Sequence, residues 1–492
     1  MSDYTLFIKR VGLIGIVRLL GRAQGLILLP ILAKTLGAAG YGVWAQIGVT
    51  IALMMPFVMA GLPSAMLRFL PEAKEKKDFA KGFFMVFFAV FFISIIGALV
   101  LFLLSKQFSF FLLKDASVIL LVQVASLLII LETLNTVVLE PFRIIGKIKE
   151  YSILNIFQII IETGLVGFLV FSGFGLWGAI IGLLITKGIT LSLSLFILIS
   201  HIGFTLPDFS RIRPYLMFGL PLIPSTLFLF LIESSDRYVI GFFQGAASVG
   251  IYSVAYGLGV IPAVFMAPLS YILSPTVFRF YTTGEIEKVK NFLSYSLKYF
   301  LLFAIPATFG LFMLANSLLT ILTTPEFILS TSALIVLLLS LSMIFEGVRA
   351  IFGTTLMIFK DVRNIARAVL IAGVMNLILN IIFVPIFGIV AAAITTFLAY
   401  LLLGGMYFYD SRKYLKFDIN LPFIIKSILS SIVMVIAVYV LNPLGIMKIL
   451  LSVGVGAIVY FLILFLLKGI SKKEFNIFTR LLKLNKGYEK LQ

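Results

Sequence analysis

A few charged side chains fall inside apolar stretches of this sequence, and they are the residues best suited to chemistry. Arg18 and Arg22 lie one helical turn apart in the first apolar stretch, and Lys187 lies near the middle of a later one. Ionisable groups inside a bilayer are costly and usually face a cavity or a partner. The planar fork of arginine suits phosphate oxygens. We predict that these three cations bind the phosphates of an anionic ligand. The alternative is that they pair with buried acids, for which the sequence offers Glu132, Glu162, Glu233, Asp236 and Glu346.

A polar stripe marks a second candidate site. Asn155, Gln158 and Glu162 share one face of an otherwise apolar helix. We expect these side chains, together with Glu132, to line a cavity or to couple transport to an ion such as H⁺ or Na⁺. Both interpretations require that the apolar stretches lie in a membrane.

Two further groups of charges are predicted to be gates or structural ion pairs. Glu233 precedes Arg237 by four residues, which is the favourable order for an ion pair within a helix, and Asp236 lies beside them. Glu346 and Arg349 are three residues apart and favour the same interpretation.

Several classes of function are disfavoured by what the sequence lacks. It has no cysteine and a single histidine, His201, which argues against disulfides and against thiolate or histidine metal sites. The nearest approach to a phosphate-binding loop, Gly146-Lys147, lacks the upstream glycine and the following Ser or Thr. We therefore expect no cofactor, no metal, no nucleotide-driven step and no catalytic residue. Transport would draw on an ion gradient or the membrane potential.

The elements that position these residues are membrane-spanning helices. Of the 492 residues, 61% are hydrophobic and only 12% are charged, and the mean hydropathy is +1.16. A helix needs about twenty apolar residues to cross the hydrocarbon core. This rule predicts an all-α polytopic membrane protein with about fourteen transmembrane helices, near 10–34, 42–63, 82–105, 117–140, 151–172, 176–200, 215–240, 247–272, 293–315, 329–352, 365–384, 388–409, 420–441 and 446–468.

The net charge of +18 is explained by orientation rather than by nucleic acid. Thirty of the 39 lysines and arginines fall in alternate gaps between spans or in the two termini, five fall in the other gaps and four fall within spans. Loops rich in Lys and Arg stay in the cytoplasm. We predict a protein of the cell (cytoplasmic or inner) membrane with both termini in the cytoplasm, and a basic amphipathic helix near 471–486 lying on the membrane lipids.

An internal repeat divides the chain. The segment GAAGYGVW from Gly37 recurs as GAASVGIY from Gly245, and FGLWGAI from Phe174 recurs as FGIVAAA from Phe387. Between them, the basic stretch at 146–150 has a counterpart at 360–364. Because six helices is an even number, the two copies enter the membrane in the same direction. We predict two parallel six-helix lobes around a central cavity: an N-lobe over 1–213, a C-lobe over 214–410, and a last pair of helices with a basic tail over 411–492.

The stretch from Gly219 to Gly259, which contains PLIP and Asp236-Arg237, resembles the signature of polysaccharide-biosynthesis exporters, and LAKTLGAAGYGVWA from Leu32 resembles their first outer loop. The chain is similar over about 1–410 to the O-antigen and repeat-unit flippases of the multidrug/oligosaccharidyl-lipid/polysaccharide (MOP) exporter superfamily. This resemblance implies a flippase that turns a polyprenyl-diphosphate-linked oligosaccharide from the cytoplasmic to the outer leaflet by alternating access. It also implies pathway partners, namely glycosyltransferases or a polymerase.

Arg18 and Arg22 fall where related flippases of lipid-linked peptidoglycan precursors place essential arginines in the first span. Those proteins also carry a cavity arginine in the eighth span, and here none occurs before Arg279. This departure favours an oligosaccharide over a peptidoglycan precursor. The alternatives are an exporter of drugs or of another lipid-linked cell-wall precursor, a membrane enzyme, for which a soluble catalytic loop is missing, and a scaffold without transport.

Overall fold

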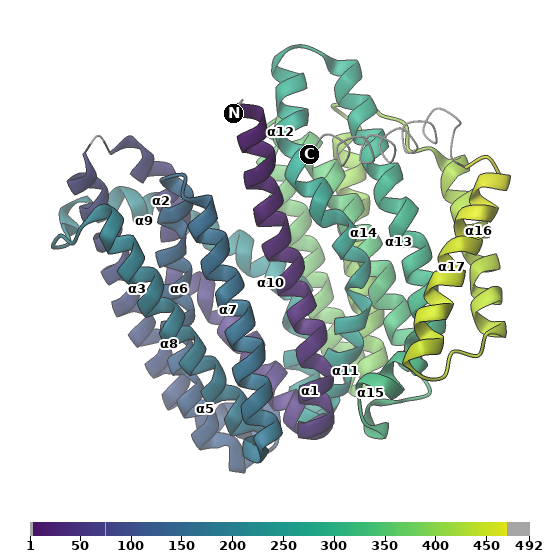
Figure 1. Ribbon diagram of the computed structural model, residues 1–492, viewed down its shortest axis with the longest axis horizontal. Helices are drawn as coiled ribbons and strands as arrows, with labels where there is room; N and C mark the ends of the chain where they lie inside the picture. Colours follow the sequence, from purple (N-terminus) through teal and green to yellow (C-terminus); the bar gives the residue numbers. More distant parts are fainter. Residues whose placement is uncertain (1–2, 74, 470–492) are drawn as a thin grey trace, which may run out of the picture.

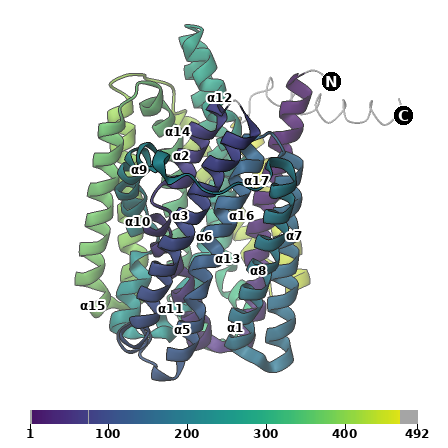
Figure 2. The ribbon, with the colours of Figure 1, turned by 90° about the vertical axis from the view of Figure 1, so that its left-hand side faces the viewer.

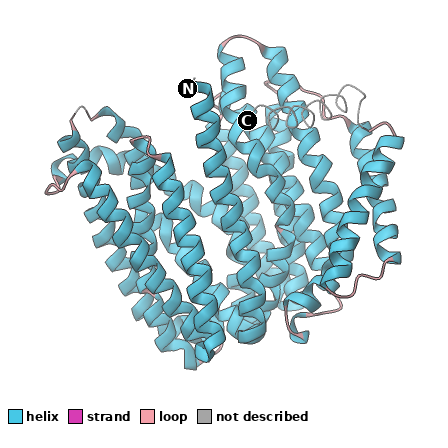
Figure 3. Ribbon diagram, viewed as in Figure 1, coloured by secondary structure: helices cyan, strands magenta, loops and turns pink. Residues whose placement is uncertain are grey.

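Every regular element in the described part of the chain is a helix (Figure 3). The structure is a computed structural model that describes residues 3–73 and 75–469, so the amphipathic helix predicted near 471–486 lies outside the described residues. The first half contains α1 (Asp3–Met59), α2 (Leu62–Phe69), α3 (Lys76–Leu103), α4 (Ser105–Phe108), α5 (Ile119–Ala125), α6 (Leu127–Ile144), α7 (Ile148–Leu169) and α8 (Gly175–Ile202). The remainder contains α9 (Ile212–Gly219), α10 (Ile223–Gln244), α11 (Ala246–Gly259), α12 (Met266–Thr282), α13 (Ile286–Leu322), α14 (Ser332–Ile358), α15 (Val362–Ser411), α16 (Leu421–Val440) and α17 (Ile446–Leu466).

The predicted fourteen spans are confirmed. Eleven stretches of the described chain are long and apolar enough to cross a membrane. Three of these, of 48 to 55 residues, are too long for one crossing. Each is interrupted at glycines with positive φ: Gly37 in α1, Gly173 and Gly175 between α7 and α8, and Gly388 in α15. Each therefore holds two spans.

The backbone repeats where the sequence repeats. Gly37 has φ 67° and ψ −179°, and its counterpart Gly245 has φ 82° and ψ −176°. A positive φ with an extended ψ is accessible almost only to glycine, so both copies need this residue for the same turn. The second pair also agrees, with φ 52° and ψ −133° at Gly175 and φ 65° and ψ −148° at Gly388.

The basic turns between α6 and α7 and between α14 and α15 match as closely. Gly146 and Lys360 both have a positive φ, and the residues that follow them, Lys147 and Asp361, have φ −82° with ψ 53° and 58°. In each turn this following residue donates its backbone N–H to the carbonyl five residues earlier, at 2.7 and 2.9 Å. Asp361 then accepts a hydrogen bond from the backbone N–H of Asn364 and so caps α15. Three matched turns in the same order support duplication of a six-helix unit.

The two halves form two lobes with α1 between them (Figure 1). Helices α2, α3 and α5–α8 make the N-lobe, and α10–α15 make the C-lobe (Figure 1). In the view turned by 90°, the helices of the N-lobe lie in front of those of the C-lobe (Figure 2). Helices α16 and α17 pack against α13 at the far edge of the C-lobe. Each lobe has its own apolar core, around Phe83 and Phe142 in the N-lobe and around Phe300 and Leu356 in the C-lobe.

The seventh span is divided between the lobes. Its first part, α9, packs on α2, and its Tyr215 belongs to the N-lobe core. A tighter helical turn at Leu220–Leu222 follows, and then α10 packs along α15 of the C-lobe. Gly61 and Gly219 hold α2 and α9 together, because a Cβ on either glycine would lie within 2.5 Å of a backbone oxygen of the other segment.

Candidate functional site

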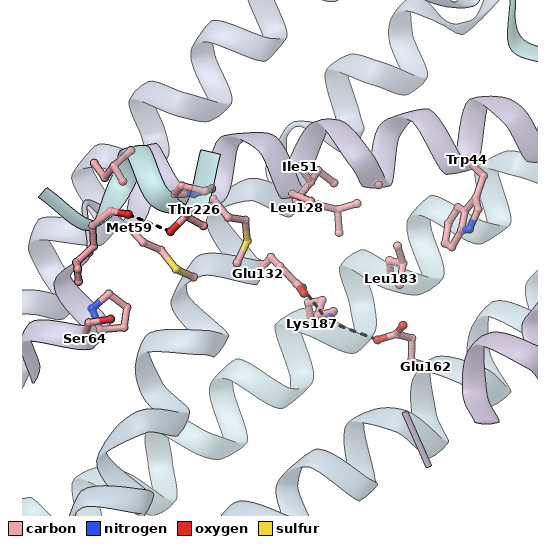
Figure 4. A pocket seen from close by; sticks show the side chains of 18 residues that line it. Trp44, Ile51, Met59, Ser64, Leu128, Glu132, Glu162, Leu183, Lys187 and Thr226 are labelled. Carbon is pink, nitrogen blue, oxygen red and sulfur yellow. Dashed lines mark hydrogen bonds and ion pairs between the residues drawn. The ribbon is translucent and has the colours of Figure 1, made fainter. Parts of the chain in front are cut away.

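The first cavity lies between the N-lobe and the start of α10 (Figure 4). It has a volume of about 590 Å³, and its walls come from the second half of α1 and from α2, α6, α7, α8 and α10. Most of the lining is apolar, as at Trp44 and Leu128. The charged residues of this lining are Glu132, Glu162 and Lys187, one from each of three helices.

Lys187 is held between two carboxylates. Its Nζ lies 2.7 Å from Oε2 of Glu132 and 3.5 Å from Oε2 of Glu162. The lysine side chain is 9% exposed and that of Glu132 is 34% exposed, so the group is only partly screened by solvent. With all three side chains ionised, the triad of Glu132, Glu162 and Lys187 carries one net negative charge. It therefore attracts a cation and repels an anion.

Buried neutral side chains fix α8 beside this triad. Asn135 donates its Nδ2 to the carbonyl oxygen of Lys187 at 2.9 Å, and the hydroxyl of Thr190 donates to Oδ1 of Asn135 at 3.0 Å. The predicted polar stripe on α7 reaches the cavity only at Glu162. Asn155 and Gln158 are half-buried outside its walls, and Asn155 donates to the carbonyl of Tyr151 on its own helix.

The second cavity, of about 470 Å³, lies between the lobes. Its lining includes Trp44 and Ile51 from α1 and Glu233, Arg237 and Tyr256 from the C-lobe. Trp44 lines both cavities, so the two share a wall along α1.

Arg237 pairs with Asp236 rather than with Glu233. Its Nη1 lies 3.4 Å from Oδ1 of Asp236, and of Glu233 it contacts only the backbone oxygen, at 3.1 Å. The ion pair predicted from four-residue spacing is thus replaced by one between neighbours. Asp236 is fully buried, and its other oxygen accepts a hydrogen bond from the hydroxyl of Tyr252. The guanidinium also lies over the ring of Tyr256, 4.2 Å from its centroid.

Arg349 forms a two-pronged ion pair with Glu346. Its Nε lies 2.6 Å from Oε2, and its Nη2 lies 2.5 Å from Oε1. The offset of 214 residues that relates Gly146 to Lys360 also relates Glu132 to Glu346. Each lobe therefore places an acid, paired with a cation, at the same position of its fourth span.

Arg18 and Arg22 lie on one exposed face in the first half of α1. They are not among the residues that line the two cavities above. Leu19 and Gly15, from the same helix, line an apolar groove of about 350 Å³ against α12 and α13, with Phe265 among its walls. Arg18 and Arg22 are therefore not brought together with Lys187 in any of these three cavities.

A close crossing of two helices joins the lobes at the end of the molecule near Gly37. A Cβ on Gly42 of α1 would lie 1.7 Å from the carbonyl oxygen of Ala246 in α11, and a Cβ on Gly250 would lie 2.0 Å from that of Ala38. These contacts are reciprocal, because Ala38 and Gly42 match Ala246 and Gly250 in the repeat. The twofold relation between the halves therefore passes through this crossing. No feature of the sequence other than the repeat itself could have indicated it.

Two hydrogen bonds hold the lobes together beside the crossing. Oε1 of Glu326, in the turn between α13 and α14, accepts the backbone N–H of Ala38 at 2.9 Å. Nζ of Lys114 in the N-lobe donates to the carbonyl of Phe243 in the C-lobe at 2.5 Å. Both cavities begin near the crossing and extend along α1 away from it.

Gln46 is buried between two contacts of the lobes. Gly42, Gln46 and Thr50 recur every four residues on one face of α1. Gly42 touches α11, and Thr50 accepts a hydrogen bond from the hydroxyl of Tyr238 in α10 at 2.9 Å. The amide of Gln46 is fully buried, and neither its nitrogen nor its oxygen has a hydrogen-bond partner among the described residues. A buried polar group without a partner costs about 1–3 kcal/mol.

The two lobes, fourteen spans and shared central cavities define a multi-pass membrane protein with the transporter fold of the MOP superfamily. The structure aligns with the lipid II flippase MurJ in an inward closed conformation, with a TM-score of 0.75 and 18% identity, over 91% of this chain and 97% of that one. It also aligns with the MATE multidrug transporter DinF-BH, with a TM-score of 0.61 and 17% identity, over 84% of this chain and 98% of that one.

Within that class, the chain belongs to the polysaccharide biosynthesis protein family, which matches residues 7–281. It is 29% identical over 256 residues to the probable low-salt glycan biosynthesis flippase Agl15 of Haloferax volcanii, over 52% of this chain and 53% of that protein. It is 27% identical over 168 residues to the probable flippase AglR of the same organism, over 33% of this chain and 34% of that one. The chain thus matches about half the length of the first of these relatives and a third of the second.

Proposed function

We propose that this protein is a flippase that moves a polyprenyl-diphosphate-linked oligosaccharide from the cytoplasmic to the outer leaflet by alternating access. The observation that carries the proposal is the position of the cavities, on one side of the crossing of Gly42 with Gly250. With the termini in the cytoplasm, as the loop charges predict, that side is the cytoplasmic one. The state described here is then closed toward the outside. Membership of the polysaccharide biosynthesis protein family supports the class of substrate.

We assign the chemistry of the transport site to two separate groups. Arg18 and Arg22 are proposed to bind the substrate's diphosphate, because they are exposed on one face of α1. Lys187 is a weaker candidate for that role, because Glu132 and Glu162 already neutralise it. We propose instead that the triad exchanges the coupling cation, H⁺ or Na⁺, since a carboxylate in excess over its cation can take up one further positive charge. Pathway partners such as glycosyltransferases would supply the substrate, and the protein itself would act without catalysis.

A second candidate function has one observation in its favour. An exporter of cationic amphiphilic drugs is expected to have an acidic, apolar cavity, and the first cavity has one negative charge in excess and mostly apolar walls. The family match favours the flippase.

Both candidates are tested by reconstitution in vesicles with a fluorescent polyprenyl-diphosphate sugar, whose accessibility is followed from each side. We expect faster translocation than in empty vesicles, and a large loss with Arg18→Ala combined with Arg22→Ala. The matched control removes two exposed cations elsewhere, with Arg363→Ala and Lys416→Ala. Translocation equal to that of empty vesicles, together with uptake of a cationic dye, would favour the drug exporter. Equal activity of the two double variants would overturn the role of the α1 arginines.

A further inference from the structure

A third cavity lies within the C-lobe and shares no lining residue with the two cavities described above. It has a volume of about 490 Å³ and is lined by α10, α12, α14 and α15. Its polar walls consist of two arginines and several hydroxyl-bearing side chains: Arg349, Arg367, Ser225, Ser270, Ser274, Thr354 and Tyr407. No acidic residue is among the described residues that line it. Its size is within the range of ordinary ligand pockets.

The net charge of the ion pairs around this C-lobe cavity is positive, whereas that of the Lys187 triad is negative. Arg349 uses its Nε and Nη2 on Glu346, and its guanidinium carbon lies 5.7 Å from the centroid of the Tyr407 ring. Nη2 of Arg367 lies 2.9 Å from Oδ2 of Asp410, whose Oδ1 already accepts Nζ of Lys413 at 2.7 Å. Three cations thus share two carboxylates and leave one positive charge in excess. The side chain of Arg367 is half exposed, so it can reach a ligand.

Arg367 lies near the turn that joins α14 to α15, and Arg349 lies deeper along α14. Arg367 is five residues after the start of α15, and Arg349 is nine residues before the end of α14. At 1.5 Å per residue they lie about 8 and 14 Å from the ends of these helices. The polar interface of a bilayer occupies roughly 5–8 Å on each side of its hydrocarbon core. An anion entering from the headgroup layer therefore meets Arg367 first and Arg349 next.

We propose that the C-lobe cavity is a phosphate-binding subsite, which takes the diphosphate of the lipid-linked substrate as it enters from the cytoplasmic leaflet. This inference rests on the proposed function for the identity of the substrate, and on the arginines and hydroxyls for the chemistry. Arginine binds phosphate oxygens through parallel N–H groups, and the serine and threonine hydroxyls suit the remaining oxygens. The phosphate of an anionic phospholipid has the same chemistry, so the experiment must separate the two sources.

The test uses the full-length protein in nanodiscs of phosphatidylcholine, titrated with inorganic pyrophosphate in a calorimeter. We expect saturable binding that Arg367→Gln weakens about tenfold or more, because hydrogen bonds between charged groups are the strong ones. Asp410 keeps Lys413 as a partner in this variant, so the fold should persist. The control is Arg363→Gln, which removes the same charge one turn earlier on the same helix and outside the cavity. Equal affinities of the two variants would overturn the subsite.

Two further arms identify the source of the phosphate. A short-chain polyprenyl diphosphate should displace pyrophosphate, whereas the same mole fraction of phosphatidylglycerol should not. Equal displacement by phosphatidylglycerol would make this a phospholipid site and would overturn the assignment to substrate. Arg349→Lys keeps the positive charge beside Glu346 but removes the planar guanidinium, and it should also weaken the binding of pyrophosphate.

The vesicle assay separates this inference from the proposed function. If the wild-type protein flips the lipid-linked sugar while Arg367→Gln binds pyrophosphate normally, only the subsite is refuted. If pyrophosphate binding depends on Arg367 but the wild-type protein flips nothing, the proposed function is refuted and an anion site remains.

Discussion

Replacing Gly42 by alanine should separate the lobes at their crossing, which is the outer end of the protein in the orientation proposed above. The added Cβ would lie 1.7 Å from the carbonyl oxygen of Ala246, whereas ordinary Cβ contacts begin near 3.4 Å. The obstacle is backbone and cannot rotate away, so the lobes must separate at this point before the methyl group fits. Gly250→Ala should act in the same way, because its Cβ would lie 2.0 Å from the carbonyl oxygen of Ala38.

The size of the effect follows from the cost of overpacking. Extra methyl groups in a tight interior cost about 1–3 kcal/mol, which corresponds to a ratio of roughly 5–150. We therefore expect the ratio of outer-closed to outer-open molecules to fall by that factor in either glycine variant. In the double variant the ratio should fall by less than the product of the two single effects, because one separation of the helices relieves both clashes.

The measurement is the distance between spin labels on the two lobes. The chain has no cysteine, so Ser117→Cys and Ser330→Cys, which are exposed on the N-lobe and C-lobe near the crossing, give the only labelling sites. Gly42→Ala should shift the distance distribution to longer values. The control is Gly48→Ala on the same helix, where an added Cβ has no atom within 4 Å. If Gly42→Ala matches Gly48→Ala, the crossing is not the outer closure.

Three further predictions concern other parts of the fold. Gln46→Leu should favour the outer-closed state by about 1–3 kcal/mol, since it removes a buried amide without partners, and the same spin labels should report a narrower, shorter distance distribution. Lys187→Met should lower the free energy of unfolding by about 2–3 kcal/mol, less than for a fully buried pair because Glu132 is a third exposed. Adding Glu132→Gln should restore part of the lost stability. Unchanged stability of Lys187→Met in detergent denaturation would contradict the triad. At Asp361 burial raises the carboxyl pKa, but hydrogen bonds from two neighbours more than offset this and hold the pKa below its usual 3.8. The carboxylate therefore stabilises α15 above pH 3.8 and loses this effect as the pH falls below it. The amide oxygen of an asparagine can cap a helix without titrating, so stability should fall more steeply with decreasing pH in the wild type than in Asp361→Asn, and parallel stability profiles would refute the cap.

The spans and the duplication could be predicted from the sequence, because both depend on properties that add up along the chain. Apolar length decides whether a helix crosses the membrane, and the loop charges decide its direction. The glycines at 37, 245, 175 and 388 are needed for local backbone conformations, so their recurrence appears in the sequence as directly as in the structure.

The partners of the charged residues could be predicted only in part. Spacing within one helix indicates Glu346 with Arg349 correctly, but it favours Glu233 over Asp236 as the partner of Arg237. The choice depends on burial, and Asp236 is enclosed by side chains from distant parts of the sequence, including Tyr252 and Thr396. Contacts between helices depend on how the helices cross, which spacing does not encode.

Lys187 illustrates the same limit. The sequence indicates a buried cation and offers acids in other spans, but it does not say which acids meet it. Only the packing of α6, α7 and α8 brings Glu132 and Glu162 to the same ammonium group. That packing changes the expected ligand of the first cavity from an anion to a cation.

Because the seventh span is divided between the lobes, the two lateral sides of the molecule differ in how easily their helices can bend. Its counterpart, the first half of α1, runs as an uninterrupted helix to Gly37, whereas the seventh span changes both its pitch and its lobe at Leu220–Leu222. In the proposed alternating-access cycle the seventh span can bend at that turn, where Pro221 has no N–H to lose, whereas the first half of α1 keeps its helical conformation through Pro30 as far as Gly37. In the proposed function the lipid tail of the substrate stays in the bilayer, so it must pass along one lateral side of the molecule. The two duplicated halves therefore differ in their first spans, and we expect the lipid tail to pass on the side of the seventh span, which can bend.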